Sequence, residues 1–202
     1  MKFFKDKMNI LILVLIIAIL FVSMSLKNKY TAETNTSNIT IIGDSRMVGL
    51  CSNKWYKDDK GTCIAKSAMG LSWFKNTAIK EVDKLNHNQK ENIVLNLGVN
   101  DLYNINNYIN EYKKLATGSW KDLNIIILSV NPTKDSYDRL NSEIDSFNEK
   151  MKNSLNSYEN ITYCDSSTYL KNNGFTSGDG LHYSAKTSKD IYEQIKKCIN
   201  SL

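Results

Sequence analysis

Short runs of apolar, mostly β-branched residues alternate along the chain with longer segments whose apolar residues recur every three to four positions. Continuous apolar runs bounded by polar residues are typical of strands buried on both faces. They predict strands at residues 38–42, 62–65, 92–97, 123–130 and 160–163. The intervening segments have the period of amphipathic helices. They predict helices at 47–56, 71–85, 105–116, 138–155 and 187–199.

This alternation decides the fold class that we expect. Parallel strands need a crossover connection, usually a helix, and helices then cover both faces of the sheet. The pattern predicts an α/β domain with a five-stranded parallel sheet. In such sheets the functional loops gather beyond the carboxyl ends of the strands. Residues 43–46, 68–71 and 98–101 should therefore lie along one edge.

The N-terminal part of the chain has a different pattern. Residues 8–26 are almost wholly apolar, and about 20 such residues suffice to cross a bilayer. Lysines precede them, so the positive-inside rule predicts a cytoplasmic N-terminus and an extracytoplasmic domain. The alternative is a secreted protein with a cleaved signal peptide, but no A-x-A-like site follows. We expect a stub and anchor at 1–29, a linker at 30–37 and one domain at 38–202, held to the cell membrane by a single pass.

The net charge of +5 is concentrated around the apolar segment. Lys2, Lys5, Lys7, Lys27 and Lys29 flank it, and the remainder of the chain is nearly neutral. A nearly neutral domain lacks the positive surface that binding to a phosphate backbone requires. No nucleic-acid partner is therefore expected.

The first motif with chemical potential, Gly43-Asp44-Ser45, directly follows the first predicted strand. A serine in this position can lie at the start of a helix, whose N-terminal amides favour developing negative charge. Asp and Ser are also common helix caps, so the motif alone is compatible with a structural role.

A second motif, Asp179-Gly180-Leu181-His182, precedes the last predicted helix. A serine nucleophile needs a base, and the base needs a group that orients its ring and stabilises its charged form. An aspartate three residues before a histidine can do this within one loop, although a simple surface turn has the same pattern. The other histidine, His87, lies in a polar link, and we interpret it as a surface residue.

Two further segments follow predicted strands. The side chain of Asn100, in Gly98-Val99-Asn100-Asp101, can stabilise an oxyanion together with backbone N–H groups. Gly70 can let its own N–H approach a ligand, because it has no side chain. Both segments are also ordinary turn sequences when taken alone.

Taken in order, GDS at 43–45, Gly70, GxND at 98–101 and DxxH at 179–182 resemble the four sequence blocks of the SGNH hydrolases, also called GDSL-like. The resemblance extends from Ile39 to the C-terminal end. It implies a flavodoxin-like three-layer α/β/α sandwich with serine esterase activity.

The resemblance also implies roles for individual residues. Ser45 is expected to be the nucleophile, His182 the base and Asp179 the residue that orients it. The oxyanion hole would consist of the backbone N–H groups of Ser45 and Gly70 and the side chain of Asn100. No cofactor is expected, and no metal either, since no His/Cys cluster has ligand spacing.

One departure from the family pattern is Arg46, which stands where the family name has a leucine. Its guanidinium can reach an anionic group of a substrate, or it can pair with Asp44 or Asp101. The sequence leaves these alternatives open. Asp101 and Tyr183 are further candidates for contact with the substrate.

The expected substrate is an O-acetyl ester on a cell-envelope or extracellular glycan, given the expected location and a family rich in carbohydrate esterases. Aromatic residues near the motifs that can form a sugar platform are Trp73, Phe74, Tyr103 and Tyr183, although Phe74 also suits the core. The alternatives are an O-acyltransferase acting on a glycan, a lipid esterase or lysophospholipase, and an inactive binding module. The complete set of motif residues argues against the last.

Four cysteines, Cys51, Cys63, Cys164 and Cys198, are an even number in a compartment expected to be oxidising. Cys51 can meet Cys63, and Cys164 can meet Cys198. Free cysteines buried as small apolar residues are the alternative.

Overall fold

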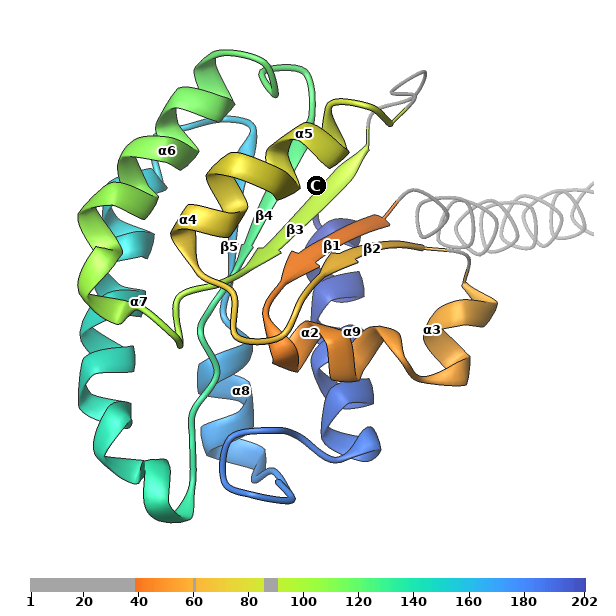
Figure 1. Ribbon diagram of the computed structural model, residues 1–202, viewed down its shortest axis with the longest axis vertical. Coiled ribbons are helices and arrows are strands. Elements are labelled where there is room, and N and C mark those ends of the chain that lie inside the picture. The colour runs from red at the N-terminus through yellow and green to blue at the C-terminus, as the bar shows by residue number, and fades with distance from the viewer. Residues whose placement is uncertain (1–38, 60, 86–90) are drawn as a thin grey trace, which may run out of the picture. The chain divides into compact units, whose positions relative to one another are not determined.

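The computed structural model describes residues 39–59, 61–85 and 91–202. They form a single five-stranded parallel sheet in the order β2-β1-β3-β4-β5 (Figure 1). This is the flavodoxin-like strand order, as the resemblance implied. The strands are β1 (Ile39–Gly43), β2 (Thr62–Ala65), β3 (Asn92–Asn96), β4 (Asn124–Leu128) and β5 (Ile161–Cys164).

Helices cover the sheet on both faces (Figure 1). One face carries α4 (Leu71–Trp73), a π-helical turn (Phe74–Ala78), α5 (Ile79–Val82), α6 (Ile105–Thr117) and α7 (Asn141–Leu155). The other face carries α2 (Ser45–Cys51), α3 (Lys54–Asp58), α8 (Ser166–Asn173) and α9 (Ala185–Asn200). Short 3-10 helices, Leu102–Asn104 and Asp135–Leu140, precede α6 and α7.

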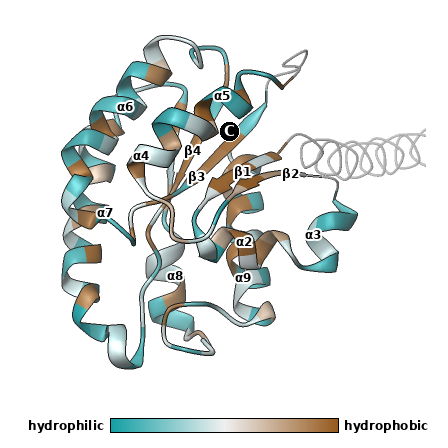
Figure 2. Cartoon of the chain, viewed as in Figure 1, coloured by the Kyte–Doolittle hydropathy of each residue, from teal (hydrophilic) through white to brown (hydrophobic). Residues whose placement is uncertain are grey.

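Successive side chains of a strand enter different cores. Ile93 and Leu95 of β3 pack with α4 to α7, whereas Val94 between them packs with α2 and α9. Figure 2 shows apolar strands between helices whose outward surfaces are hydrophilic. The predicted three-layer sandwich is therefore confirmed, and the continuous apolar runs of the sequence are explained by burial on both sides.

One predicted helix was wrong, and one observed helix was not predicted. The segment 47–56 is not one helix, because α2 ends at Cys51 and Asn53 adopts an extended backbone before α3. The side chains of Ser52 and Asn53 donate to the carbonyl of Gly49 and so compete with the continuing helix. Helix α8 was not predicted at all, since its short sequence shows no clear apolar period.

Two disulfides connect elements on the α2/α9 side of the sheet. Cys51 at the end of α2 is bonded to Cys63 in β2, with Cα atoms 6.4 Å apart. Cys164 at the end of β5 is bonded to Cys198 in α9, with Cα atoms 5.9 Å apart. Of the two alternatives that the sequence left open, the structure thus has the disulfides and not free cysteines.

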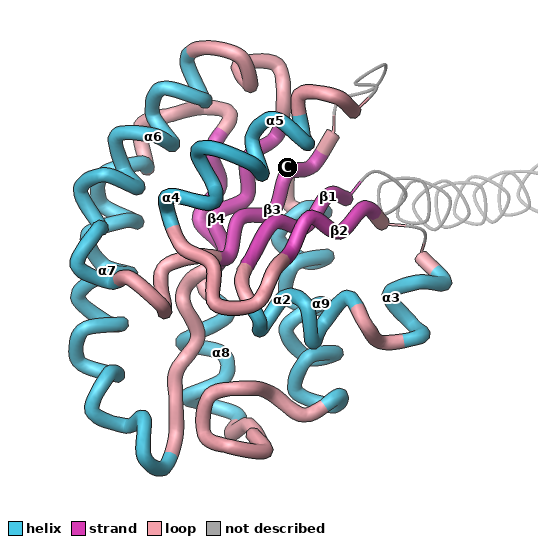
Figure 3. Tube along the Cα trace, viewed as in Figure 1, coloured by secondary structure: helices cyan, strands magenta, loops and turns pink. Residues whose placement is uncertain are grey.

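The loops after the strands gather at the carboxyl edge of the sheet (Figure 3). Ser45 follows β1, Gly70 follows β2 and Asn100 follows β3, as the sequence predicted. The predicted anchor and linker, residues 1–37, lie outside the described residues, as does His87. Within the described part of the chain, no helix has the length and apolarity needed to span a membrane.

Candidate active site

Ser45 is the first residue of α2, directly beyond β1. The Asp44 carboxylate caps this helix by accepting a hydrogen bond of 2.9 Å from the Arg46 backbone N–H. The cap fixes the turn between strand and helix. Ser45 is half-buried, and its hydroxyl faces the loop that carries His182.

A chain of hydrogen bonds joins three predicted residues. His182 Nε2 lies 2.9 Å from Ser45 Oγ, and His182 Nδ1 lies 2.7 Å from Asp179 Oδ2. The predicted nucleophile and the predicted base are thus within hydrogen-bonding distance, and the histidine contacts a carboxylate on its other nitrogen. In this arrangement the imidazole can accept the serine proton while the carboxylate stabilises the resulting charge.

The Asp179 carboxylate is held ionised by its own loop. Its Oδ1 accepts from the backbone N–H groups of His182 at 2.7 Å and Leu181 at 2.9 Å. The bond from the His182 backbone, the contact with its ring and the bond from Leu181 lower the pKa of Asp179 well below its usual range. The Asp179 carboxylate therefore stays negative at neutral pH.

Gly70 lies against the side chain of Asp101. A Cβ at position 70 would meet Asp101 Oδ2 at 2.5 Å, so only glycine fits. That carboxylate accepts from the N–H of Leu71 at 2.9 Å, from Asn104 and from the hydroxyl of Tyr108. Asp101 therefore joins the loop after β2 to the loop after β3.

The predicted oxyanion donors have hydrogens left for a ligand. One N–H of the Asn100 amide donates to the Met69 carbonyl at 2.8 Å, which orients the group and leaves its second N–H unused. Within the described residues, the backbone N–H groups of Ser45 and Gly70 have no acceptor. Two peptide N–H groups and one amide at this edge are the donor set that an oxyanion hole requires.

In the described part of the chain, Arg46 forms no salt bridge with Asp44 or Asp101, the two partners within the protein that the sequence left open. Its side chain is only 3% exposed, and Nη1 donates to the Asn131 carbonyl at 2.8 Å. The guanidinium carbon lies 5.3 Å from the centre of the Tyr183 ring, within the range of a cation–π contact. Burial raises the pKa of Asp44, and the nearby Arg46 charge opposes that shift. Buried in this way, Arg46 supports the site from within and does not present its charge at the surface.

The segment that follows β4, residues 129–134, holds the histidine loop; we call it the post-β4 segment. Lys134 donates its N–H to the Gly180 carbonyl at 2.8 Å, and Tyr183 donates its hydroxyl to the Pro132 carbonyl at 2.7 Å. Gly180 has φ of +85°, and a Cβ there would lie 2.3 Å from the Lys134 carbonyl oxygen. The DxxH turn therefore needs glycine at this position.

The post-β4 segment is itself fixed by two asparagines of α7. Asn148 accepts from the Val130 N–H and donates to the Val130 carbonyl, at 2.8 Å in each case. Asn141 makes the same pair of bonds with Thr133. Sequence reasoning missed this segment, and only the asparagines, unusual on the inner side of a helix, could have indicated it.

Of the other substrate-contact candidates, Asp101 and Tyr183 are occupied by the internal hydrogen bonds described above. Among the aromatic residues, Phe74 is fully buried in the core, as its alternative reading suggested, and Trp73 is half-buried. Tyr103 is 83% exposed. No cluster of three or more His, Cys, Asp or Glu residues in the described part of the chain has a geometry that could hold a metal.

The fold and the family that its sequence matches define the protein as an enzyme, a hydrolase of the SGNH type. Residues 58–195 match the model of the GDSL-like lipase/acylhydrolase family. This is more than half of the chain, and the protein therefore belongs to that family. The match begins after the GDS segment, so the assignment of Ser45 depends on the geometry of the site.

Solved structures with similar folds include proteins from three bacteria. The C-terminal catalytic domain of peptidoglycan O-acetyltransferase A from Streptococcus pneumoniae has 14% identity and a TM-score of 0.64, covering 81% of this chain and 93% of that one. A lipolytic G-D-S-L family protein from Veillonella parvula has 14% identity and a TM-score of 0.65, covering 81% and 98%.

An acetyl xylan esterase from Geobacillus stearothermophilus has 14% identity and a TM-score of 0.59, covering 80% of this chain and 93% of that one. At such identities the similarity shows the fold. No curated protein matches the sequence significantly.

Proposed function

We propose that this protein is a serine esterase that hydrolyses O-acetyl esters on a cell-envelope or extracellular glycan. The observation that carries the proposal is the hydrogen-bonded chain from Asp179 through His182 to Ser45, with distances of 2.7 and 2.9 Å. Such a chain beside a set of free N–H donors is what acyl transfer through a serine requires.

The reaction would proceed in two halves. Ser45 Oγ attacks the ester carbonyl carbon while His182 Nε2 takes the hydroxyl proton, and the oxyanion lies between the donors of Ser45, Gly70 and Asn100. The C–O bond to the sugar then breaks, and His182 returns its proton to the sugar oxygen. Water, deprotonated by His182, next attacks the acyl-enzyme, which releases acetate and restores the serine.

The acetyl group and the glycan are supported by two of the structurally similar proteins. One is named as an acetyl xylan esterase, and the other as a peptidoglycan O-acetyltransferase. Both names combine an acetyl group with a carbohydrate-containing polymer. The second name also makes transfer of the acetyl group to a sugar hydroxyl the main competing reaction.

For location, we propose that residues 8–26 anchor the chain in the membrane with the domain outside the cytoplasm. The pattern of lysines and apolar residues supports this orientation. The two disulfides support it independently, since disulfides persist in oxidising compartments and are rare in the cytosol.

The orientation can be tested by adding protease to intact spheroplasts, and we expect the protease to digest the domain. Complete protection would contradict the orientation.

The activity can be tested on the full chain in mild detergent by following release of 4-nitrophenol from its acetate ester. We expect turnover by the wild type, loss of about 10³-fold or more in Ser45→Ala, and full activity in Ser52→Ala. Ser52 is an exposed serine just beyond α2 and serves as the matched control.

Adding xylotetraose as an acceptor distinguishes transfer from hydrolysis. Acetylated tetrasaccharide would indicate transfer, and acetate alone would indicate hydrolysis. Equal activity in the wild type and Ser45→Ala would contradict the serine mechanism.

A further inference from the structure

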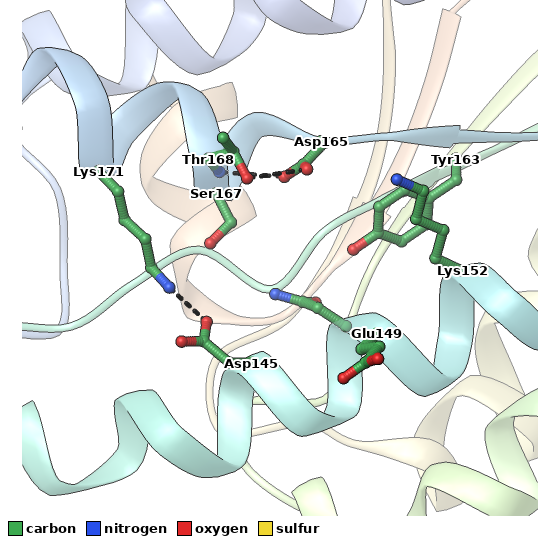
Figure 4. A pocket seen from close by; sticks show the side chains of 9 residues that line it. Asp145, Glu149, Lys152, Tyr163, Asp165, Ser167, Thr168 and Lys171 are labelled. Atoms are coloured by element: carbon green, nitrogen blue, oxygen red, sulfur yellow. Dashed lines mark hydrogen bonds and ion pairs between the residues drawn. The ribbon is translucent and has the colours of Figure 1, made fainter.

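Two pockets of similar size adjoin α7, and their polar groups differ in how they are used. The first, of about 330 Å³, lies between α7 and α8 (Figure 4). There Lys171 is paired with Asp145, and Asp165 accepts from both the backbone N–H and the hydroxyl of Thr168. A ligand would have to displace these bonds, so we interpret this pocket as a solvated groove between helices.

The second pocket, of about 300 Å³, lies between the start of α6 and the first half of α7. Leu102 and Phe147 are buried beneath it, and Ile105 is half-buried. Tyr103 stands beside this apolar floor with 83% of its surface exposed. The polar residues that line the pocket are Ser142, Glu143, Ser146 and Lys150.

The polar groups of the second pocket are available for contact with a ligand. Within the described residues, neither Glu143 nor Lys150 takes part in an ion pair, and the hydroxyl of Tyr103 has no hydrogen-bond partner. The pocket thus offers a carboxylate, an ammonium group and a phenol at its open side, together with an apolar floor. A surface with these properties can order a ligand without first breaking internal bonds.

This pocket adjoins the loop that carries the oxyanion donor Asn100. The ring of Phe147 packs directly against Gly98, where a Cβ would meet its Cζ atom at 2.6 Å. Asp101, which fixes the neighbouring Gly70, is followed at once by Leu102 in the pocket floor. The pocket floor and the predicted oxyanion donor Asn100 therefore belong to the same short stretch of chain.

A sugar ring matches these features. Its C–H face packs on aromatic and aliphatic side chains, and its hydroxyls bond to a polar edge. The volume lies at the lower end of the range for small-ligand pockets, about 300–1,000 Å³, and suits a single ring. We propose that the pocket at Tyr103 is a subsite for a sugar residue next to the acetylated one. This inference rests on the proposed glycan esterase function.

The competing occupant is the acyl chain of a lipid ester, which would use the apolar floor alone. A long acyl chain makes no hydrogen bond to the carboxylate, the ammonium group or the phenol. The observations therefore favour the sugar, and the experiments compare the two directly.

The kinetic test compares substrates within each variant of the full chain. For Tyr103→Ala we expect the ratio of kcat/KM for O-acetylated xylotetraose to that for 4-nitrophenyl acetate to fall about tenfold, through KM. Tyr103→Trp should restore most of this ratio, because an indole also stacks on a sugar.

Glu143→Gln should lower the same ratio about threefold. Glu149→Gln, on the same helix but in the other pocket, should leave it unchanged. An unchanged ratio in Tyr103→Ala would overturn the subsite, as would a loss confined to 4-nitrophenyl octanoate.

A binding test separates this inference from the esterase function. The Ser45→Ala protein should bind O-acetylated xylotetraose in calorimetry, and Ser45→Ala with Tyr103→Ala should bind it about tenfold more weakly. Binding that depends on Tyr103 in a wild type without turnover would overturn the esterase function and retain the subsite. Turnover together with equal binding by the two proteins would retain the function and overturn the subsite.

Discussion

At the scale of single residues, Arg46 and Asp179 support the site in opposite surroundings. Arg46 is buried, and its contacts with the Asn131 carbonyl and the Tyr183 ring connect the nucleophile helix to the histidine loop. Asp179 is about half exposed and depends on hydrogen bonds for its low pKa. The consequences of replacing them should therefore differ in kind.

Replacing Arg46 with the family's leucine should destabilise the domain. The change removes a buried hydrogen bond and the positive charge next to the Asp44 carboxylate, at a cost of about 2–4 kcal/mol in the free energy of unfolding. Urea unfolding followed by circular dichroism measures this. Arg139→Leu, the chain's other arginine and an exposed one, should cost less than about 0.5 kcal/mol. Equal effects of the two substitutions would contradict the role assigned to Arg46.

Replacing Asp179 with asparagine should reduce both activity and stability in a manner that depends on pH. A carboxylate with a lowered folded-state pKa contributes stability that is present above its unfolded pKa of about 3.9 and is lost as the pH falls through the folded value. The wild type should therefore exceed Asp179→Asn in unfolding free energy at pH 6, with a smaller difference at pH 3. We also expect kcat for 4-nitrophenyl acetate to fall by about 10²-fold or more.

The exposed Asp122→Asn serves as the control for this pH series. It should follow the wild type at each pH, in both unfolding free energy and kcat. A difference between the wild type and Asp179→Asn that grows toward acid would contradict the assignment.

At the scale of elements, the loop between β2 and α4 is held by the Asp101 carboxylate. Gly70→Ala would place a methyl group 2.5 Å from Asp101 Oδ2, an oxygen that already accepts hydrogen bonds from Leu71 and Asn104. The loop must shift, and the loss of one oxyanion donor should lower kcat about 10²-fold with little change in the circular dichroism spectrum. Gly49→Ala, in α2 with open space around it, should keep its activity and gain about 0.5–1 kcal/mol in stability. An active Gly70→Ala enzyme would exclude the Gly70 N–H from the oxyanion hole.

The sequence predicted the strands well because burial on both faces makes each an unbroken apolar run. It also placed Ser45, Gly70 and Asn100 at one edge, because parallel strands present their carboxyl ends together. Helix α8 was not predicted because its hydrophobic period is weak. The partners of Arg46 were not predicted for another reason. They lie on the post-β4 segment and in the histidine loop, and contacts between residues so far apart in the sequence leave no local pattern.

At the scale of the whole domain, each disulfide joins one edge strand of the sheet, β2 or β5, to a helix. They join residues 12 and 34 positions apart. Loop-closure entropy alone suggests a stabilisation of about 3 kcal/mol for the shorter loop and about 4 kcal/mol for the longer one. Cys164→Ser with Cys198→Ser should therefore lower the unfolding free energy somewhat more than Cys51→Ser with Cys63→Ser. Denaturant titrations without reductant test the order. Insensitivity of the wild type to dithiothreitol would show that the bonds contribute nothing.

The contact between Ser45 and His182 joins positions 137 residues apart, on the first described helix and just before the last. Neither half of the domain holds both the serine and its base. A ribosome must therefore complete nearly the whole domain before the hydroxyl meets the imidazole, so an unfinished chain cannot form this pair. Turnover is for this reason a direct assay of complete folding: a proteolytic cut or a misfolded segment anywhere between the two residues that separates them would silence the enzyme.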